Sequence, residues 1–144
     1  MCSSDLDAVR QNATRSPVAD AIEMRGFVPE AQMDAVWAES TAFAMPSLGE
    51  GFGLVYIEAM RQGLPVIGSI HDAASEVNVD GETGYNINLQ NPPELPDRII
   101  HLLRNRDASD QLGQRGRQRW QQHFRYGAFR ERFLPHLQTF LKYG

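Results

Sequence analysis

Two carboxylates flank a glycine-rich turn in the middle of the chain. Glu50 and Glu58 are separated by seven residues, and Gly49, Gly51 and Gly53 surround the first of them. Glycine has no Cβ, so its backbone can adopt a positive φ and approach a ligand closely. A helix that begins near Gly53 would present free N–H groups and a partial positive charge to an anion in the turn. The spacing therefore predicts a phosphate or diphosphate site between two carboxylates.

The carboxylates indicate what the phosphate group carries. Glu58 would lie about one and a half turns into the helix, since an α-helix has ~3.6 residues per turn. A carboxylate repels a diphosphate but accepts hydrogen bonds from hydroxyl groups. The pattern thus favours a ligand with a central diphosphate and a polyol at each end, which is a nucleotide-sugar. The structural alternatives are that Glu58 pairs with Arg61 or Gln62 on a helix surface and that Glu50 stabilises a helix start.

The surrounding segments alternate between strand-like and helix-like patterns. Short apolar runs predict strands at residues 21–27, 42–45 and 64–70. Helices are expected over 5–12, after Pro29, from Gly53 to a left-handed cap at Gly63, around Leu95–Leu103, after a cap at Asp107, and through the C-terminal segment. This alternation predicts a Rossmann-like, doubly wound α/β domain with a parallel sheet and C-terminal helices. Ligands in such sheets bind beyond the carboxyl ends of the strands, where the glycine-rich turn begins.

Apolar positions at helical spacing mark the expected apolar faces of the helices, and only those of the helix after Gly53 are assigned to the interior. In the helix after Gly53 these are Val55, Ala59 and Met60. In the C-terminal helices the stripes are Leu95, Ile99, Leu102 and Leu103, then Leu112, Trp120 and Phe124, then Phe129, Phe133, Leu137 and Phe140. Each stripe follows the i, i+3, i+4 spacing or a close variant of it.

Five short motifs follow one another along the chain: Glu50-Gly51-Phe52-Gly53-Leu54, Glu58-Ala59-Met60, Gly63-Leu64-Pro65-Val66-Ile67, Ser75-Glu76-Val77 and Asp80-Gly81-Glu82-Thr83-Gly84-Tyr85. This set resembles the donor-site signature of retaining glycosyltransferases with the GT-B architecture, family 4, also called glycosyl transferases group 1. The resemblance runs from about residue 26 to the C-terminus. It implies that residues 21–144 form the C-terminal, nucleotide-sugar-binding domain of a GT-B fold and that residues 1–20 belong to a partial N-terminal segment whose natural start is missing.

The resemblance also implies an activity and a set of roles. The intact enzyme would transfer a hexosyl group from a nucleotide-sugar to an acceptor hydroxyl, with an acceptor-binding N-terminal domain, and this chain alone would be inactive. Glu50 would act at the donor sugar and Glu58 would bind the ribose diol, while backbone amides of four residues would bind the phosphates: Gly51, Phe52, Gly53 and Leu54. Val28, in the turn Gly26-Phe27-Val28, would contact the nucleobase. Ser47 would either donate to a phosphate or sugar or cap the loop.

One part of the family pattern is not found. The family places an Arg and a Lys near the start of the donor domain to neutralise the diphosphate. The first Lys of this chain is Lys142, and Arg10, Arg15 and Arg25 do not stand in the expected context. Both cationic roles are therefore unassigned.

Bulk properties fit one soluble globular domain. The 144 residues have a net charge of −4, with no nucleic-acid signature overall. From Arg98 onward there are ten Lys/Arg and three Asp/Glu (+7), against four and fifteen before it (−11). The basic C-terminal region is either a set of solvated helix faces or a contact for an acidic partner or an anionic membrane. The lone Cys2, the lack of an apolar span and the lack of a signal peptide predict a cytoplasmic protein, with peripheral attachment at the inner membrane face left open.

The residue spacing gives little support for a metal site or an acid–base pair. His71 and Asp72 are adjacent, and adjacent side chains rarely face one another, so a loop contact is favoured over an acid–base pair. No Ser-His-Asp arrangement and no carboxylate–histidine metal spacing appears, so no metal or cofactor is expected and the nucleotide-sugar is a substrate. Two alternatives stay open: another GT-B-like enzyme such as an epimerase or phosphorylase, and a non-catalytic nucleotide-sugar-binding module or inactive fragment.

Overall fold

The computed structural model describes residues 3–49 and 51–143, with the backbone alone for residues 3–5 and 143. The chain divides into two compact units, Met1–Asp34 and Ala35–Gly144. Helix α2, Glu30–Glu39, begins in unit 1 and ends in unit 2, as expected for a helix opening after Pro29. The units are described separately.

Unit 1 is helical and irregular. Helix α1, Ser3–Arg15, confirms the expected N-terminal helix and is longer than the predicted 5–12. A 3-10 turn, Ala19–Ala21, follows, and no regular element intervenes before α2. The strand predicted at 21–27 is therefore wrong. A strand needs a neighbouring strand to bond its N–H and C=O groups, and unit 1 supplies none among its described residues. Phe27, counted as part of the apolar run, is 91% exposed.

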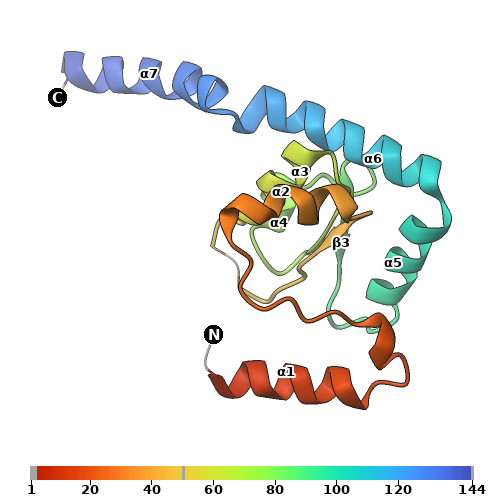
Figure 1. The fold of residues 1–144 in the computed structure, drawn as a ribbon. Coiled ribbons are helices and arrows are strands. Elements are labelled where there is room, and N and C mark those ends of the chain that lie inside the picture. Colours follow the sequence, from red (N-terminus) through yellow and green to blue (C-terminus); the bar gives the residue numbers. More distant parts are fainter. Residues whose placement is uncertain (1–2, 50, 144) are drawn as a thin grey trace. The chain divides into compact units, whose positions relative to one another are not determined.

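Unit 2 is built on a three-stranded parallel sheet (Figure 1). The strands are β1 (Phe43–Ala44), β2 (Val66–Ser69) and β3 (Gly84–Ile87), in the order β1-β2-β3. Val66 stands opposite Phe43 on one side and Gly84 on the other. Every residue of the central strand β2 is buried, as parallel sheets covered on both faces require. The predicted strands at 42–45 and 64–70 are confirmed in shortened form.

Strand β3 was not predicted because its sequence resembles a turn. Asp80-Gly81 and Thr83-Gly84 are turn signals, and Gly81 indeed has a φ of 72°. Gly84 nevertheless begins a strand and pairs with Val66 on β2, whose backbone lies so close that a Cβ at position 84 would clash with it. The glycine at position 84 thus allows β3 to approach β2 closely, in addition to ending the turn that precedes it.

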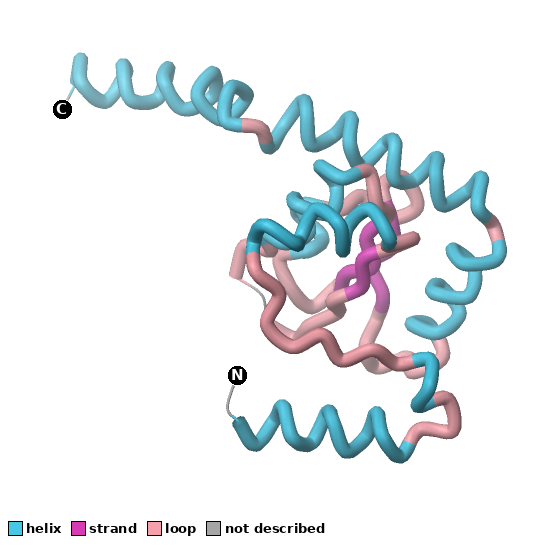
Figure 2. The backbone as a smooth tube through the Cα atoms, in the orientation of Figure 1, coloured by secondary structure: helices cyan, strands magenta, loops and turns pink. Residues whose placement is uncertain are grey.

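Helices α3 (Leu54–Gln62), α4 (Ala74–Val77), α5 (Glu94–Arg104) and α6 (Arg106–Arg119) flank the sheet of unit 2. A π-helical turn η2 (Trp120–Phe124) follows α6, and α7 (Tyr126–Tyr143) then extends away from the sheet (Figure 2). The α/β class and the parallel sheet with flanking helices are confirmed. The cap predicted at Asp107 is wrong, because α6 already begins at Arg106 after Asn105, whose side chain makes no capping bond.

The core of unit 2 lies between the sheet and the helices. Ile67, Ile87, Leu102 and Leu112 form one buried cluster. On α3, Ala59 and Met60 are buried as predicted, whereas Val55 is half-buried and Tyr56, which the prediction omitted, is fully buried.

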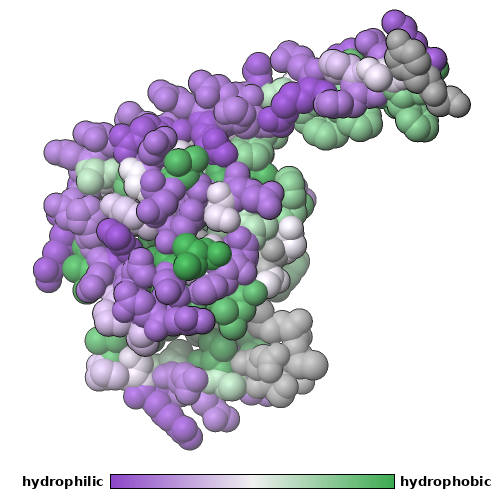
Figure 3. All heavy atoms as spheres, turned by 180° about the vertical axis from the view of Figure 1, so that it is seen from behind, coloured by the Kyte–Doolittle hydropathy of each residue, from purple (hydrophilic) through white to green (hydrophobic). Residues whose placement is uncertain are grey.

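The predicted C-terminal stripes divide into buried and exposed parts. On α5, Leu102 is buried while Leu103, one residue further round the helix, is 62% exposed. On α7, Phe129, Phe133 and Phe140 are exposed, and apolar side chains gather along one side of this helix in Figure 3. The α7 stripe is therefore not part of the core of unit 2.

Candidate functional site

The start of α3 lies at the expected edge of the sheet. Gly53 precedes this helix with φ 72° and ψ 44°, the left-handed conformation that glycine adopts most easily. Among the residues that the structure describes, no side chain caps the first turn of α3. The first N–H groups of a helix have no partner within the helix itself. In α3 the N–H of Tyr56 bonds the carbonyl of Gly53, which leaves the amides of Leu54 and Val55 for a ligand. The helix ends at Gly63, φ 79°, whose N–H bonds the carbonyls of Ala59 and Met60. Both predicted glycine positions are confirmed.

Only one of the two carboxylates of the motif belongs to the residues that the structure describes. Glu50 lies outside the described residues. Glu58 lies on α3 with an exposed side chain, and within the described part of the chain it makes no hydrogen bond or ion pair. The predicted alternative, a surface pair with Arg61 or Gln62, is not formed. The Glu58 carboxylate is thus available to accept hydrogen bonds from a ligand.

Ser47, in the loop after β1, donates its hydroxyl proton to a carboxylate. The Oγ of Ser47 lies 2.7 Å from Oδ2 of Asp72, which follows β2. A hydroxyl has one proton and two lone pairs, so Ser47 can still accept a bond from a ligand. The partner, Asp72, lies 25 positions away in the sequence, and no local signal pointed to it.

The carboxylate of Asp72 accepts three hydrogen bonds from described residues, and none of them comes from His71. Asp72 accepts from Ser47, from the phenol of Tyr56 at 3.1 Å and from the amide of Ala74 at 2.7 Å. Nε2 of His71 instead lies 3.0 Å from Oδ1 of Asn88. The two adjacent side chains do not bond to one another, in agreement with the loop-contact interpretation.

Exposed apolar side chains lie at the start of α3. Phe52 is 58% exposed and Leu54 is 64% exposed. With Ile57 they line one side of an open hollow of about 450 Å³, whose other side comes from η2 and α7. The residues of that second side are His123, Phe124, Tyr126, Phe129 and Arg132. The final helix therefore begins beside the glycine-rich motif.

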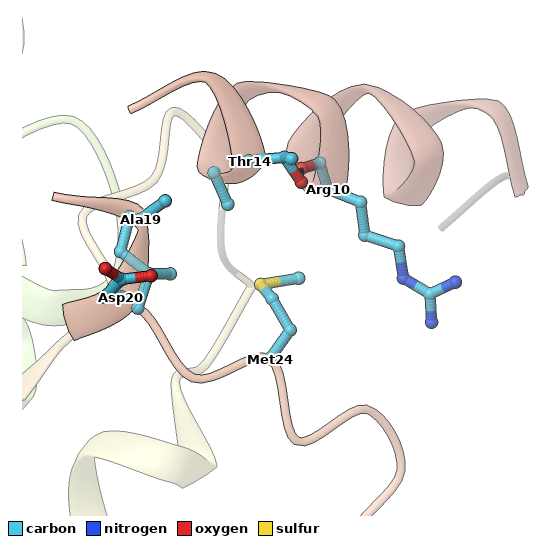
Figure 4. A pocket seen from close by; sticks show the side chains of 7 residues that line it. Arg10, Thr14, Ala19, Asp20 and Met24 are labelled. Atoms are coloured by element: carbon cyan, nitrogen blue, oxygen red, sulfur yellow. Dashed lines mark hydrogen bonds between the residues drawn. The ribbon is translucent and has the colours of Figure 1, made fainter. Parts of the chain in front are cut away.

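The residues proposed to contact a base belong to unit 1. Gly26 has a φ of 65°, which supports a turn at this point. Val28 is half-buried. Unit 1 also contains a hollow of about 410 Å³ between α1 and the 3-10 turn, and Thr14, Asp20 and Met24 are among the residues that line it (Figure 4). No residue of the glycine-rich motif lines it.

Metal-ligand clusters and membrane-spanning helices are both absent from the described residues. No three His, Cys, Asp or Glu side chains among residues 3–49 and 51–143 gather as a metal site would require. The one Asp-x-Asp triplet of the sequence, Asp5-Leu6-Asp7, lies on α1. None of the helices described here has the length and apolar character needed to cross a bilayer.

Comparison with known proteins gives a consistent result. The family model "Glycosyl transferases group 1" matches residues 4–119. Trehalose synthase of Pyrococcus horikoshii is 32% identical over 108 residues, which is 75% of this chain and 26% of that protein. Phosphatidyl-myo-inositol mannosyltransferase of Mycobacterium leprae is 35% identical over 89 residues, 61% of this chain and 24% of the relative. The chain thus spans about a quarter of the length of these relatives.

Solved structures show the fold. Sucrose-phosphate synthase from Thermosynechococcus elongatus superposes with a TM-score of 0.86 at 23% identity, covering 98% of this chain and 35% of the other. Anabaena Alr3699/HepE in complex with UDP-glucose superposes with a TM-score of 0.83 at 21% identity, covering 95% of this chain and 38% of the other. The parallel sheet and its flanking helices therefore match the GT-B glycosyltransferase fold.

Proposed function

The chain belongs to the glycosyl transferases group 1 family, and on that premise we propose that it binds the nucleotide-sugar donor of a retaining, family 4 type glycosyltransferase. In the intact enzyme a hexosyl group would pass from the donor to an acceptor hydroxyl with retention at the anomeric carbon. Residues 21–144 would be the donor domain, and an acceptor domain outside this chain would complete the enzyme.

The observation that carries the proposal is the uncapped start of α3 at the edge of a parallel sheet. Gly53 holds the left-handed turn there, and among the described residues no side chain bonds the first N–H groups of the helix. A diphosphate leaving group accumulates negative charge as the glycosidic bond breaks. Preorganised amides stabilise such charge without having to reorient during the reaction. The amides proposed for this task are those of Gly51, Phe52, Gly53 and Leu54.

The carboxylates are assigned to hydroxyl groups on either side of the diphosphate. Glu58 would hold the ribose diol, a role supported by its exposed and unpaired carboxylate among the described residues. Glu50 would orient the donor sugar at the reacting carbon. Ser47, whose hydroxyl proton goes to Asp72, would accept a hydrogen bond from a sugar hydroxyl. Val28 would pack against the base. These groups would contribute mainly by positioning the donor.

The proposed mechanism is front-face departure and attack. Neither Glu50 nor Glu58 is assigned as a nucleophile. A glycosidase also uses two carboxylates, but these flank the scissile bond and the enzyme needs no phosphate-binding loop. The glycine-rich turn therefore distinguishes a glycosyltransferase from a glycosidase. No metal or cofactor is included in the proposal. A cytoplasmic enzyme that meets the membrane peripherally through its basic C-terminal region fits the charge distribution.

The test is a binding titration with matched ligands. Anabaena HepE has been crystallised with UDP and with UDP-glucose, so UDP is the first probe and uridine is its diphosphate-free control. GDP and ADP extend the series to other bases. We expect one diphosphate to bind at least tenfold more tightly than its nucleoside, on the order of 1.4 kcal/mol. If no diphosphate binds better than its nucleoside, the donor site proposed at Gly53 does not exist.

A second measurement separates the enzyme from a binding module. We expect the 144-residue chain to bind the nucleotide without transferring sugar, and a protein extended by an acceptor domain to transfer it. Transfer by the 144-residue chain alone would contradict the expected inactivity. Binding with no turnover in any extended protein would favour the non-catalytic module.

A further inference from the structure

We propose that Tyr56 and Asp72 are positioning residues that fix the two ends of the loop joining β1 to α3, so that the phosphate-binding amides are held in place before the ligand arrives. The loop ends are residues 45–47 and 51–54. The inference rests on the proposed donor site, because it concerns the backbone groups that the site would use.

Tyr56 contacts both ends of the loop. Its side chain is completely buried beneath the start of α3. Its hydroxyl lies 2.5 Å from the carbonyl oxygen of Met45, the residue that follows β1 closely. At the other end, a Cβ on Gly53 would clash with the Tyr56 ring. The ring therefore fills the space under Gly53, and the hydroxyl holds Met45. The edge of the Phe43 ring packs against Tyr56 with centroids 5.9 Å apart, so the phenol itself has little freedom.

Asp72 ties the same loop to the next strand. Its Oδ2 accepts from Ser47 at 2.7 Å and contacts the Tyr56 hydroxyl at 3.1 Å. Its Oδ1 accepts from the amide of Ala74 at 2.7 Å, which fixes the carboxylate at the start of α4. The carboxylate thus joins groups that follow β1, β2 and the start of α3. The Tyr56 phenol has a single proton, so Met45 and Asp72 share it.

The arrangement has a consequence for the ligand. An amide that must be ordered on binding costs affinity, whereas one that is already held does not. Core packing alone does not require the hydroxyl of Tyr56, since phenylalanine would fill the same space. What the hydroxyl adds is the bond to Met45 and the contact with Asp72. Removing it should therefore loosen the loop ends while leaving the sheet intact.

The experiment compares Tyr56→Phe with Tyr85→Phe by hydrogen exchange and nucleotide titration. Tyr85 lies on β3 with its ring under Arg98, 4.4 Å from ring centroid to guanidinium carbon, and its hydroxyl has no hydrogen bond within the described chain. The hydrogen-bonded amides at the two ends of the loop report on it: the amide of Met45, which donates to Ile67, and the amide of residue 56, which donates to Gly53. In Tyr56→Phe we expect these two loop-end amides to exchange about threefold to tenfold faster, as loss of one hydrogen bond allows. Amides of β2 and β3 should keep their rates, and UDP affinity should fall by a similar factor. Tyr85→Phe should change neither.

Asp72→Asn provides a second, independent variant. It retains the size of the side chain but removes the charge that draws the Ser47 and Tyr56 hydroxyls. It should reproduce the faster exchange of the loop ends. The Tyr56 hydroxyl and the Asp72 carboxylate share one contact. Tyr56→Phe introduced into Asp72→Asn should therefore accelerate loop-end exchange by a smaller factor than it does in the wild type.

The outcomes separate this inference from the proposed function. Loop-end exchange within twofold of the wild type in Tyr56→Phe would overturn the positioning role, and so would a uniform acceleration across the sheet, which would mark a merely structural residue. If no nucleoside diphosphate binds the wild-type chain, the proposed function fails, and the exchange comparison still decides whether Tyr56 and Asp72 hold the loop.

Discussion

Replacing Glu58 by alanine separates a role in binding from a role in stability. The Glu58 side chain is exposed on α3 and has no partner among the described residues, so its removal breaks no bond within them. Alanine is also the best helix former. The free energy of unfolding should therefore change by no more than about 0.5 kcal/mol.

The effect on nucleotide binding should be much larger. A charged group that accepts hydrogen bonds from a ligand contributes about 1.5–3 kcal/mol, which corresponds to roughly tenfold to 150-fold in Kd. Simple electrostatics predicts the opposite sign, because removing a negative charge near a diphosphate reduces repulsion and should tighten binding. The direction of the change is thus informative as well as its size.

Calorimetric titration of the matched diphosphate measures the effect, and urea denaturation measures stability. Glu131→Ala is the control, since Glu131 is also an exposed helical glutamate on α7 and, unlike its neighbour Arg132, does not line the hollow beside the motif. Glu58→Gln keeps one acceptor oxygen and should fall between the wild type and Glu58→Ala. Unchanged or tighter binding by Glu58→Ala would refute the assigned role, and so would a large loss of stability with unchanged affinity.

Two further predictions concern the packing that supports the site. Gly113→Ala should lower the free energy of unfolding by about 1–3 kcal/mol or more, because the new Cβ would clash with the carbonyl of Gly63, which follows α3, and force α6 away. Gly127→Ala is the control. Its Cβ would approach nothing closer than 4.0 Å, so this variant should be neutral or stabilising. Equal denaturation midpoints would contradict this. Thr83→Val should cost about 1–3 kcal/mol, since the buried Asn78 amide oxygen loses the Thr83 hydroxyl at 2.7 Å, whereas Thr139→Val on the exposed α7 should cost far less. Equal losses for the two threonine variants would rule out the buried bond as the cause.

The parts of the site that the sequence predicted are those with local causes. The left-handed residues at Gly53 and Gly63 were predictable because glycine adopts that conformation most easily and stands at both ends of an amphipathic run. Strand β2 was predictable because its residues are continuously apolar or small and flanked by proline. The start, length and end of α3 follow from nine residues and their two neighbours.

The parts that were missed depend on contacts distant in sequence. The run at 21–27 has strand-like composition, but a strand exists only when a neighbour bonds it, and composition does not name the neighbour. Gly84 follows a turn-like sequence, yet it begins β3, because the strand is defined by its pairing with Val66, a residue 18 positions earlier. Similarly, the exposure of the α7 stripe cannot be derived from its spacing, since spacing identifies an apolar face without identifying what covers it.

The same distinction applies to the chemistry of the site. The glycine-rich motif is contiguous, so it can be recognised in a sequence, but the shape of its loop depends on Asp72, which lies 25 positions after Ser47 and 16 after Tyr56. These groups meet because β1 and β2 are adjacent parallel strands whose carboxyl ends share one edge of the sheet. A chain could therefore keep every residue of the motif and still lose the arrangement of its amides if the Tyr56 hydroxyl or the Asp72 carboxylate were lost. Comparing motif-bearing chains with and without such a pair would show whether the motif alone is sufficient for nucleotide binding.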